Sequence, residues 1–104
     1  MKPKSAMYNN SVHMLKSIVR DVFKDDDVKV ILFGSRVRED YLETSDMDVA
    51  ILPGREVKQG KLALMREKIE FSNIPYKVDE VDLSRAPKSF TQAVLKEGKL
   101  IWGN

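Results

Sequence analysis

Two aspartates separated by one residue, Asp46 and Asp48, are the side chains of this sequence best suited to chemistry. They lie at the start of an apolar run, residues 47–52, that is typical of a β-strand. Side chains at positions i and i+2 of a strand project from the same face, so the two carboxylates would lie side by side. Two carboxylates that close repel each other unless a cation lies between them. The pair therefore predicts a site for a hard cation such as Mg²⁺, which binds carboxylates together with substrate phosphates.

A Gly-Ser turn, Gly34-Ser35, follows the preceding apolar run and would lie beside the two aspartates if the runs pair as neighbouring strands. Glycine lets the backbone approach a bulky anion, and the amides that open the next segment can point at that anion. The Ser35 hydroxyl adds a donor. Further candidate phosphate ligands nearby are Ser45, Arg36 and Arg38. The turn thus predicts a binding site for the phosphates of a substrate.

A third carboxylate is available from the segment YKVDEVDL, residues 76–83, which has the composition of a further strand. Asp79 would share a face with Lys77 and Val81, whereas Asp82 would lie on the opposite face. Only one of these two aspartates can therefore join the site. Its carboxylate would complete a site for two metal ions, which clamp the attacking and leaving oxygens of a phosphoryl displacement, or would serve as the base for the acceptor hydroxyl.

The elements that must position these residues follow from the hydrophobic periodicity. Apolar residues recur at helical spacing between Val12 and Phe23, which predicts a helix with Ser11 as its N-cap and an end near Lys24. Residues 28–33 are almost wholly apolar, which predicts a strand buried on both faces. The remaining predicted elements are a short helix or turn over 35–41, strands over 47–52 and 76–83, helices over 61–72 and 89–97 with Ser89 as N-cap, and a short strand or apolar tail over 100–102. The expected fold is α/β (α+β), with a small mixed sheet packed against helices and the site at the exposed end of the first two strands.

Composition limits the classes of function. The 104 residues, of which 42% are hydrophobic and 33% charged, predict one domain spanning 1–104. The sequence has no cysteine, which excludes disulfides, a thiol nucleophile and a zinc–thiolate site. A net charge of +2 is too small to predict a nucleic-acid partner. No apolar run reaches the roughly 18 residues of a membrane span, and the first residues lack a signal-peptide core, so we expect a cytoplasmic protein.

The segment GSRVREDYLETSDMD resembles the signature of the minimal nucleotidyltransferase (MNT) family, within the DNA polymerase β-like nucleotidyltransferase superfamily. That signature is a Gly-Ser pair, ten residues and Asp-x-Asp, here Gly34, Ser35, Asp46 and Asp48. The resemblance extends through YKVDEVDL, where it implies that Asp79 is the third catalytic carboxylate, and through SFTQAVLKEGKLIW. Two positions depart from the family: Glu39 replaces a frequent glycine, and Glu80 replaces a commonly apolar residue. The charge of Glu80 predicts that the third strand lies at a sheet edge or against a partner.

The resemblance implies a metal-dependent enzyme with ATP as substrate and two Mg²⁺ ions as cofactors. Asp46, Asp48 and Asp79 would be catalytic and bind metal, whereas the nucleotide would contact Gly34, Ser35, Arg36 and Ser45. Stand-alone members of this size pair with a HEPN-domain toxin and act as its antitoxin by transferring AMP to a toxin tyrosine. A hetero-oligomer is thus expected, or a homodimer when the chain is alone. Two alternatives are a binding module that neutralises its partner by occlusion and, less favoured, transfer to a small molecule such as an aminoglycoside.

Overall fold

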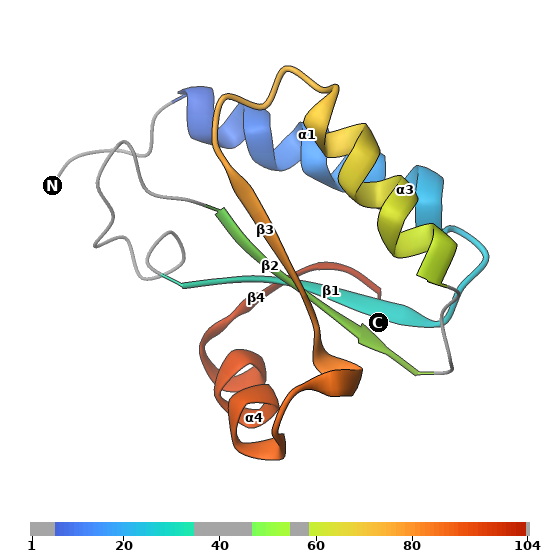
Figure 1. Ribbon diagram of the computed structural model, residues 1–104. Helices are drawn as coiled ribbons and strands as arrows, with labels where there is room; N and C mark the ends of the chain where they lie inside the picture. The colour runs from blue at the N-terminus through green and yellow to red at the C-terminus, as the bar shows by residue number, and fades with distance from the viewer. Residues whose placement is uncertain (1–5, 35–46, 55–58, 104) are drawn as a thin grey trace, which may run out of the picture.

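The computed structural model describes residues 6–34, 47–54 and 59–103. Along the chain these form α1 (Ala6–Phe23), β1 (Val28–Phe33), β2 (Met47–Pro53), α3 (Gln59–Glu70), β3 (Val78–Asp82), the 3₁₀ helix η1 (Leu83–Arg85), α4 (Lys88–Glu97) and β4 (Lys99–Trp102). The four strands form one mixed sheet in the order β3-β2-β1-β4 (Figure 1). The expected α/β fold, a small mixed sheet with helices against it, is therefore confirmed. The predicted short helix over 35–41 lies outside the described residues.

The central pair of strands is antiparallel, and β4 also runs antiparallel to β1, whereas β3 runs parallel to β2. A parallel neighbour needs a crossover, and α3 supplies it between β2 and β3. The end of β1 and the start of β2 consequently lie at the same end of the sheet, on the left of Figure 1. Because β3 runs parallel to β2, its start lies level with the start of β2.

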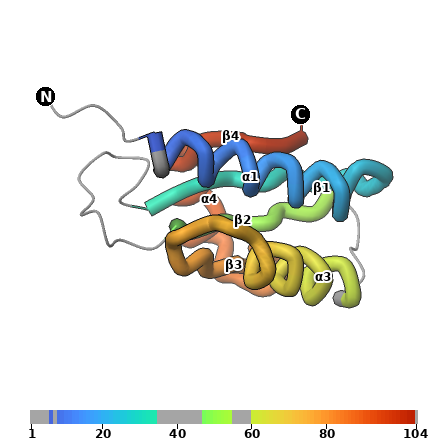
Figure 2. Tube along the Cα trace, turned by 90° about the horizontal axis from the view of Figure 1, so that it is seen from above, coloured from blue at the N-terminus to red at the C-terminus, as the bar shows by residue number. Residues whose placement is uncertain are grey.

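Helices cover both faces of the sheet. Figure 2 shows α1 and α3 on the face turned to the viewer, with α4 on the far side. Alternate residues of β1 and β2 supply the larger core on the α1 and α3 face, where they pack with helix residues such as Leu15, Phe23 and Met65. The intervening residues form a smaller core with α4 and η1; its buried members are Ile31, Ala50, Leu83 and Val94. Both strands thus supply buried residues to both faces of the sheet, and for β1 this burial was predicted from its apolar composition.

Two predicted helix caps are wrong. The first helix begins at Ala6 rather than after Ser11, which is fully buried inside the helix. The helix extends because Tyr8, only 3% exposed, packs into the core and meets Tyr76 edge to face, with ring centroids 6.5 Å apart. The last helix begins at Lys88, one residue earlier than expected, with Pro87 rather than Ser89 in the cap position. Proline suits that position because its fixed backbone angle and missing N–H are compatible with a helix start.

Candidate functional site

The two described aspartates of the predicted site lie on neighbouring strands at the same level. Phe33 of β1 pairs with Asp48 of β2, and Asp48 in turn pairs with Asp79 of β3. Neighbouring strands lie about 4.8 Å apart, so these three residues form one row across the sheet. The row lies at the end of the sheet where β1 ends and β2 and β3 begin. The register therefore brings together the two carboxylates that the sequence placed 31 positions apart.

Both carboxylates project from the sheet face that carries α4. On β2, Met47 and Val49 belong to the core beneath α1 and α3, so the intervening Asp48 points to the opposite face. On β3, Val78 packs against that same core, whereas Val81 packs against the core under α4. Asp79 shares a face with Val81 and hence with Asp48. The face assignment predicted for Asp79 is therefore confirmed.

Gly34 brings the backbone directly against the Asp48 carboxylate. It follows the last residue of β1 and adopts φ = +87°, in the left-handed region that side chains disfavour. A Cβ at this position would lie only 2.5 Å from Asp48 Oδ2. Only glycine thus allows both the turn and the close approach of the backbone to this carboxylate. The contact joins the predicted phosphate-binding turn to the predicted metal ligand.

Asp79 is accessible to a ligand, with 46% of its side chain exposed. Its Oδ1 lies 4.0 Å from Nζ of Lys77, two residues earlier on the same face of the chain. This exposed lysine was not singled out as a site residue in the sequence. The ion pair offsets part of the negative charge that Asp48 and Asp79 concentrate in the row, although such an exposed pair contributes little to stability.

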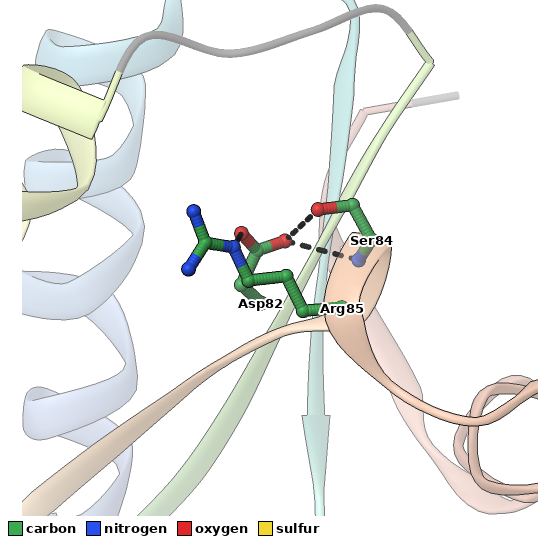
Figure 3. Close-up of polar contacts among 3 residues, drawn as sticks. All are labelled: Asp82, Ser84 and Arg85. Carbon is green, nitrogen blue, oxygen red and sulfur yellow. Dashed lines mark hydrogen bonds and ion pairs between the residues drawn. The ribbon is translucent and has the colours of Figure 1, made fainter.

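Asp82, the other candidate for the third acid, has a structural role instead. Its Oδ1 accepts hydrogen bonds from the backbone N–H of Ser84 at 3.0 Å and from the Ser84 hydroxyl at 2.6 Å (Figure 3). Its Oδ2 lies 3.8 Å from Nε of Arg85. The carboxylate thereby caps η1. Asp82 also pairs with Ile51, three positions along the ladder from the Asp48 row, or about 10 Å away.

At the end of the row opposite Asp79, Phe33 forms an aromatic pair with Phe90. The rings of Phe33 and Phe90 meet edge to face, with centroids 5.9 Å apart and an interplanar angle of 84°. Phe90 belongs to α4, so this contact connects the helix to the last residue of β1, directly before Gly34. Neither residue was predicted as a site residue from the sequence, because their contact depends on how α4 packs and leaves no local pattern. Phe33 could have been noticed only as the neighbour of Gly34.

The remaining predicted site residues lie outside the described ranges: Ser35, Arg36, Arg38, Ser45 and Asp46. Within the described ranges, no group of three or more His, Cys, Asp or Glu side chains is arranged to hold a metal ion. The described part of the site therefore consists of two carboxylates in one row and the Gly34 backbone beside them. No helix in the described ranges has the length and apolar character of a membrane span.

Comparisons with known proteins agree with this arrangement. The family described as "Polymerase beta, Nucleotidyltransferase" matches residues 16–104. Among curated protein sequences, none matches this chain significantly. One similar solved structure is a toxin–antitoxin crystallised with AMP-PNP, at 26% identity and a TM-score of 0.71 over 89% of this chain and 73% of the other.

Two further solved structures have a similar fold. A complex of a tri-AMPylated HEPN toxin with an MNT antitoxin from Shewanella oneidensis matches at 25% identity and a TM-score of 0.66, over 92% of this chain and 72% of the other. A protein from Sulfolobus solfataricus, described as a candidate nucleotidyltransferase, matches at 27% identity and a TM-score of 0.55, over 100% of this chain and 93% of the other. Because the family match spans most of the sequence and includes every predicted site residue, this chain belongs to the polymerase β nucleotidyltransferase family.

Proposed function

We propose that this protein transfers AMP from ATP to a hydroxyl group, most simply a tyrosine, of a HEPN-type toxin and so acts as the antitoxin of a toxin–antitoxin pair. The observation that carries the proposal is the row in which Asp48 and Asp79 lie in register beside the backbone of Gly34. The similar structures support the choice of nucleotide and acceptor, because one was crystallised with AMP-PNP and another contains an AMPylated HEPN toxin. Such a pair would operate in the cytoplasm, where ATP is available.

The residues of the row fit a divalent metal ion. Asp48 and Asp79 offer only oxygen ligands, which Mg²⁺ prefers. Asp46 and the phosphates of ATP would supply further oxygen ligands. Two like charges on adjacent strands are unfavourable unless a cation offsets them. When bound, Mg²⁺ would neutralise the charge that develops on the phosphate oxygens during transfer.

The order of residues in the row also suggests from which side the acceptor attacks and on which side the pyrophosphate leaves. The acceptor hydroxyl oxygen attacks the α-phosphorus of ATP, the bond from that phosphorus to the bridging oxygen breaks, and pyrophosphate leaves. In-line displacement requires the attacking and leaving oxygens on opposite sides of the phosphorus. Gly34, which together with Ser35 we assign to the leaving phosphates, follows β1 on one side of Asp48. Asp79, which we assign to accept the hydroxyl proton, lies on the other side.

The proposal is tested by incubating the purified chain with radiolabelled ATP, Mg²⁺ and a HEPN-domain protein, which is first sought in the reading frame next to that of this chain. The wild-type chain is expected to label that protein, whereas Asp46→Asn and Asp48→Asn are expected to abolish labelling. Both variants should fold, because each removes one of two neighbouring like charges. Circular dichroism and urea unfolding check this expectation.

Asp82→Asn is the matched control, because it makes the same chemical change in an aspartate that caps η1. It is expected to lower the free energy of unfolding by about 1 kcal/mol and to leave labelling intact. Labelling that persists in Asp46→Asn and Asp48→Asn would contradict the proposed function. So would the absence of any labelling by the wild-type chain.

A further inference from the structure

The outer edge of β3 carries backbone groups that β2 does not use. The Met47 N–H donates to the Lys77 carbonyl at 2.8 Å, which fixes the register of the parallel ladder. In such a ladder, alternate residues of a strand direct both their N–H and C=O groups to one side. Lys77, Asp79 and Val81 therefore face β2. The N–H and C=O groups of Val78 and Glu80 face outward.

This edge is open in the described part of the fold. The strand order places β3 at one end of the sheet, as the charge of Glu80 predicted. In Figure 1, no described helix or strand lies in front of β3. All five residues of β3 are partly exposed. An additional strand could thus hydrogen-bond to Val78 and Glu80 without disturbing the β2–β3 ladder.

A hollow of about 550 Å³ adjoins the same edge. Its lining combines the apolar and aromatic residues Ile69, Ile74, Tyr76 and Val78 with the charged residues Arg66, Glu70, Lys77, Asp79 and Glu80. Asp79 therefore belongs both to this hollow and to the catalytic row. Glu80, whose side chain is only 12% exposed, is held by Arg66 of α3, with Nε 3.5 Å from Oε2.

We propose that an extended segment of the toxin adds to the outer edge of β3 and delivers its acceptor hydroxyl beside Asp79. This inference rests on the proposed function and names how that site recognises its protein substrate. A strand paired to β3 would lie about 4.8 Å from it, so the residue level with Asp79 would extend the row by one position. That residue lies on the side of Asp48 opposite Gly34, from which the acceptor oxygen must attack.

The geometry also specifies the sequence of this segment. Successive side chains of a strand point to opposite faces, so the residues next to the acceptor would point away from Asp79. They would face the hollow, where Ile69, Ile74 and Tyr76 can contact an apolar side chain next to the acceptor. The strand β3 contains acidic residues and no basic residue, which favours a neutral or basic toxin segment beside it.

Charge argues against a second copy of this chain at the same edge. Two β3 strands paired antiparallel about their centres would place Glu80 opposite Glu80. Like charges directly opposite each other destabilise a strand pair, whereas charges on an edge strand discourage self-association. A segment of a different protein is therefore the better occupant.

The test compares Glu80→Pro with Glu80→Ala. Both variants lose the contact with Arg66. Only proline also removes the outward N–H and places its ring where an added strand would hydrogen-bond. Proline is compatible with an edge strand whose N–H faces outward, and Asp79 before it already has the extended backbone that proline requires. With wild-type labelling of the HEPN-domain protein established, Glu80→Pro is expected to raise the KM for that protein about tenfold or more relative to Glu80→Ala. The Kd for ATP should be equal in the two variants.

A second measurement needs no variant. Amide hydrogen exchange of the ¹⁵N-labelled chain is followed with and without saturating HEPN-domain protein. The outward amides of Val78 and Glu80 are expected to slow about tenfold or more in the complex. Equal KM values for the proline and alanine variants, or unchanged exchange of both amides in the complex, would overturn the inference while wild-type labelling still supports the proposed function. A dimer of the chain alone in which both amides are already protected would also overturn it.

Discussion

Gly34 is the residue where backbone conformation and the candidate chemistry are most closely connected. Its positive φ disfavours any side chain, and an added Cβ would meet Asp48 Oδ2 at 2.5 Å. Gly34→Ala is expected to lower the free energy of unfolding by about 1–2 kcal/mol, because alanine is strained in the left-handed region. It should also displace the Asp48 carboxylate and reduce labelling of the HEPN-domain protein about a hundredfold, since small displacements of reacting groups have large effects. Urea unfolding and initial labelling rates measure the two effects.

Gly60→Ala is the control for this substitution. Gly60 lies in the first turn of α3, and an added Cβ would meet no atom within 4 Å. Alanine there is expected to stabilise the chain by up to about 1 kcal/mol, because it favours the helix, and to leave labelling unchanged. If Gly34→Ala behaved like Gly60→Ala, the close approach of Gly34 to Asp48 would have no role in transfer.

Single residues of the site could be predicted where a local rule decides their position. The period of two in a strand placed Asp79 and Asp82 on opposite faces, and packing under α4 confirms the face of Asp79. The residues alone did not decide between these two aspartates; the family resemblance did. In the structure Asp82 is used locally, because its carboxylate caps the 3₁₀ helix η1, an element that was not predicted from the sequence. The position of β3 at a sheet edge or against a partner was predicted only from the charge of Glu80.

At the scale of elements, strands were predicted better than helix ends. The bounds of β1 follow from its run of apolar residues, which only Lys29 interrupts and which ends where Gly34 breaks it. The start of α1 could not be found because it depends on tertiary contacts of Tyr8, whereas Ser11 has the chemistry of a cap but lies inside the helix. Burial overrides local capping preference when a helix gains core contacts by extending.

The two helix layers differ in how firmly they are held. Among the described residues, fourteen are buried in the core under α1 and α3, whereas four are buried in the core under α4. Amides of α4 are therefore expected to exchange with solvent at least about tenfold faster than those of β1. Val94→Ala, which truncates the one buried side chain of α4, should lower the free energy of unfolding by about 1.5 kcal/mol and accelerate exchange in α4 most. Uniform exchange across α4 and β1 would show instead that the molecule opens as a single unit.

At the scale of the whole molecule, catalysis and occlusion make different predictions for the same variant. Occlusion of the toxin requires only that the surface of the fold bind it, whereas AMP transfer requires the carboxylates of the row. The double variant Asp46→Asn/Asp48→Asn is expected to co-purify with a co-expressed HEPN-domain toxin but to lose protection of cells against it. Colony counts after induction of the toxin measure protection, and a pull-down measures binding.

The charge-matched control for that variant is Asp25→Asn/Asp27→Asn. It makes the same change of net charge in two exposed residues that precede β1, at the opposite end of that strand from Gly34. It is expected to retain both binding and protection, because neither carboxylate lies in the row. If Asp46→Asn/Asp48→Asn protected cells as well as this control, the fold would neutralise its partner by occlusion. If only Asp46→Asn/Asp48→Asn lost protection while it still bound the toxin, neutralisation would depend on the transfer of AMP.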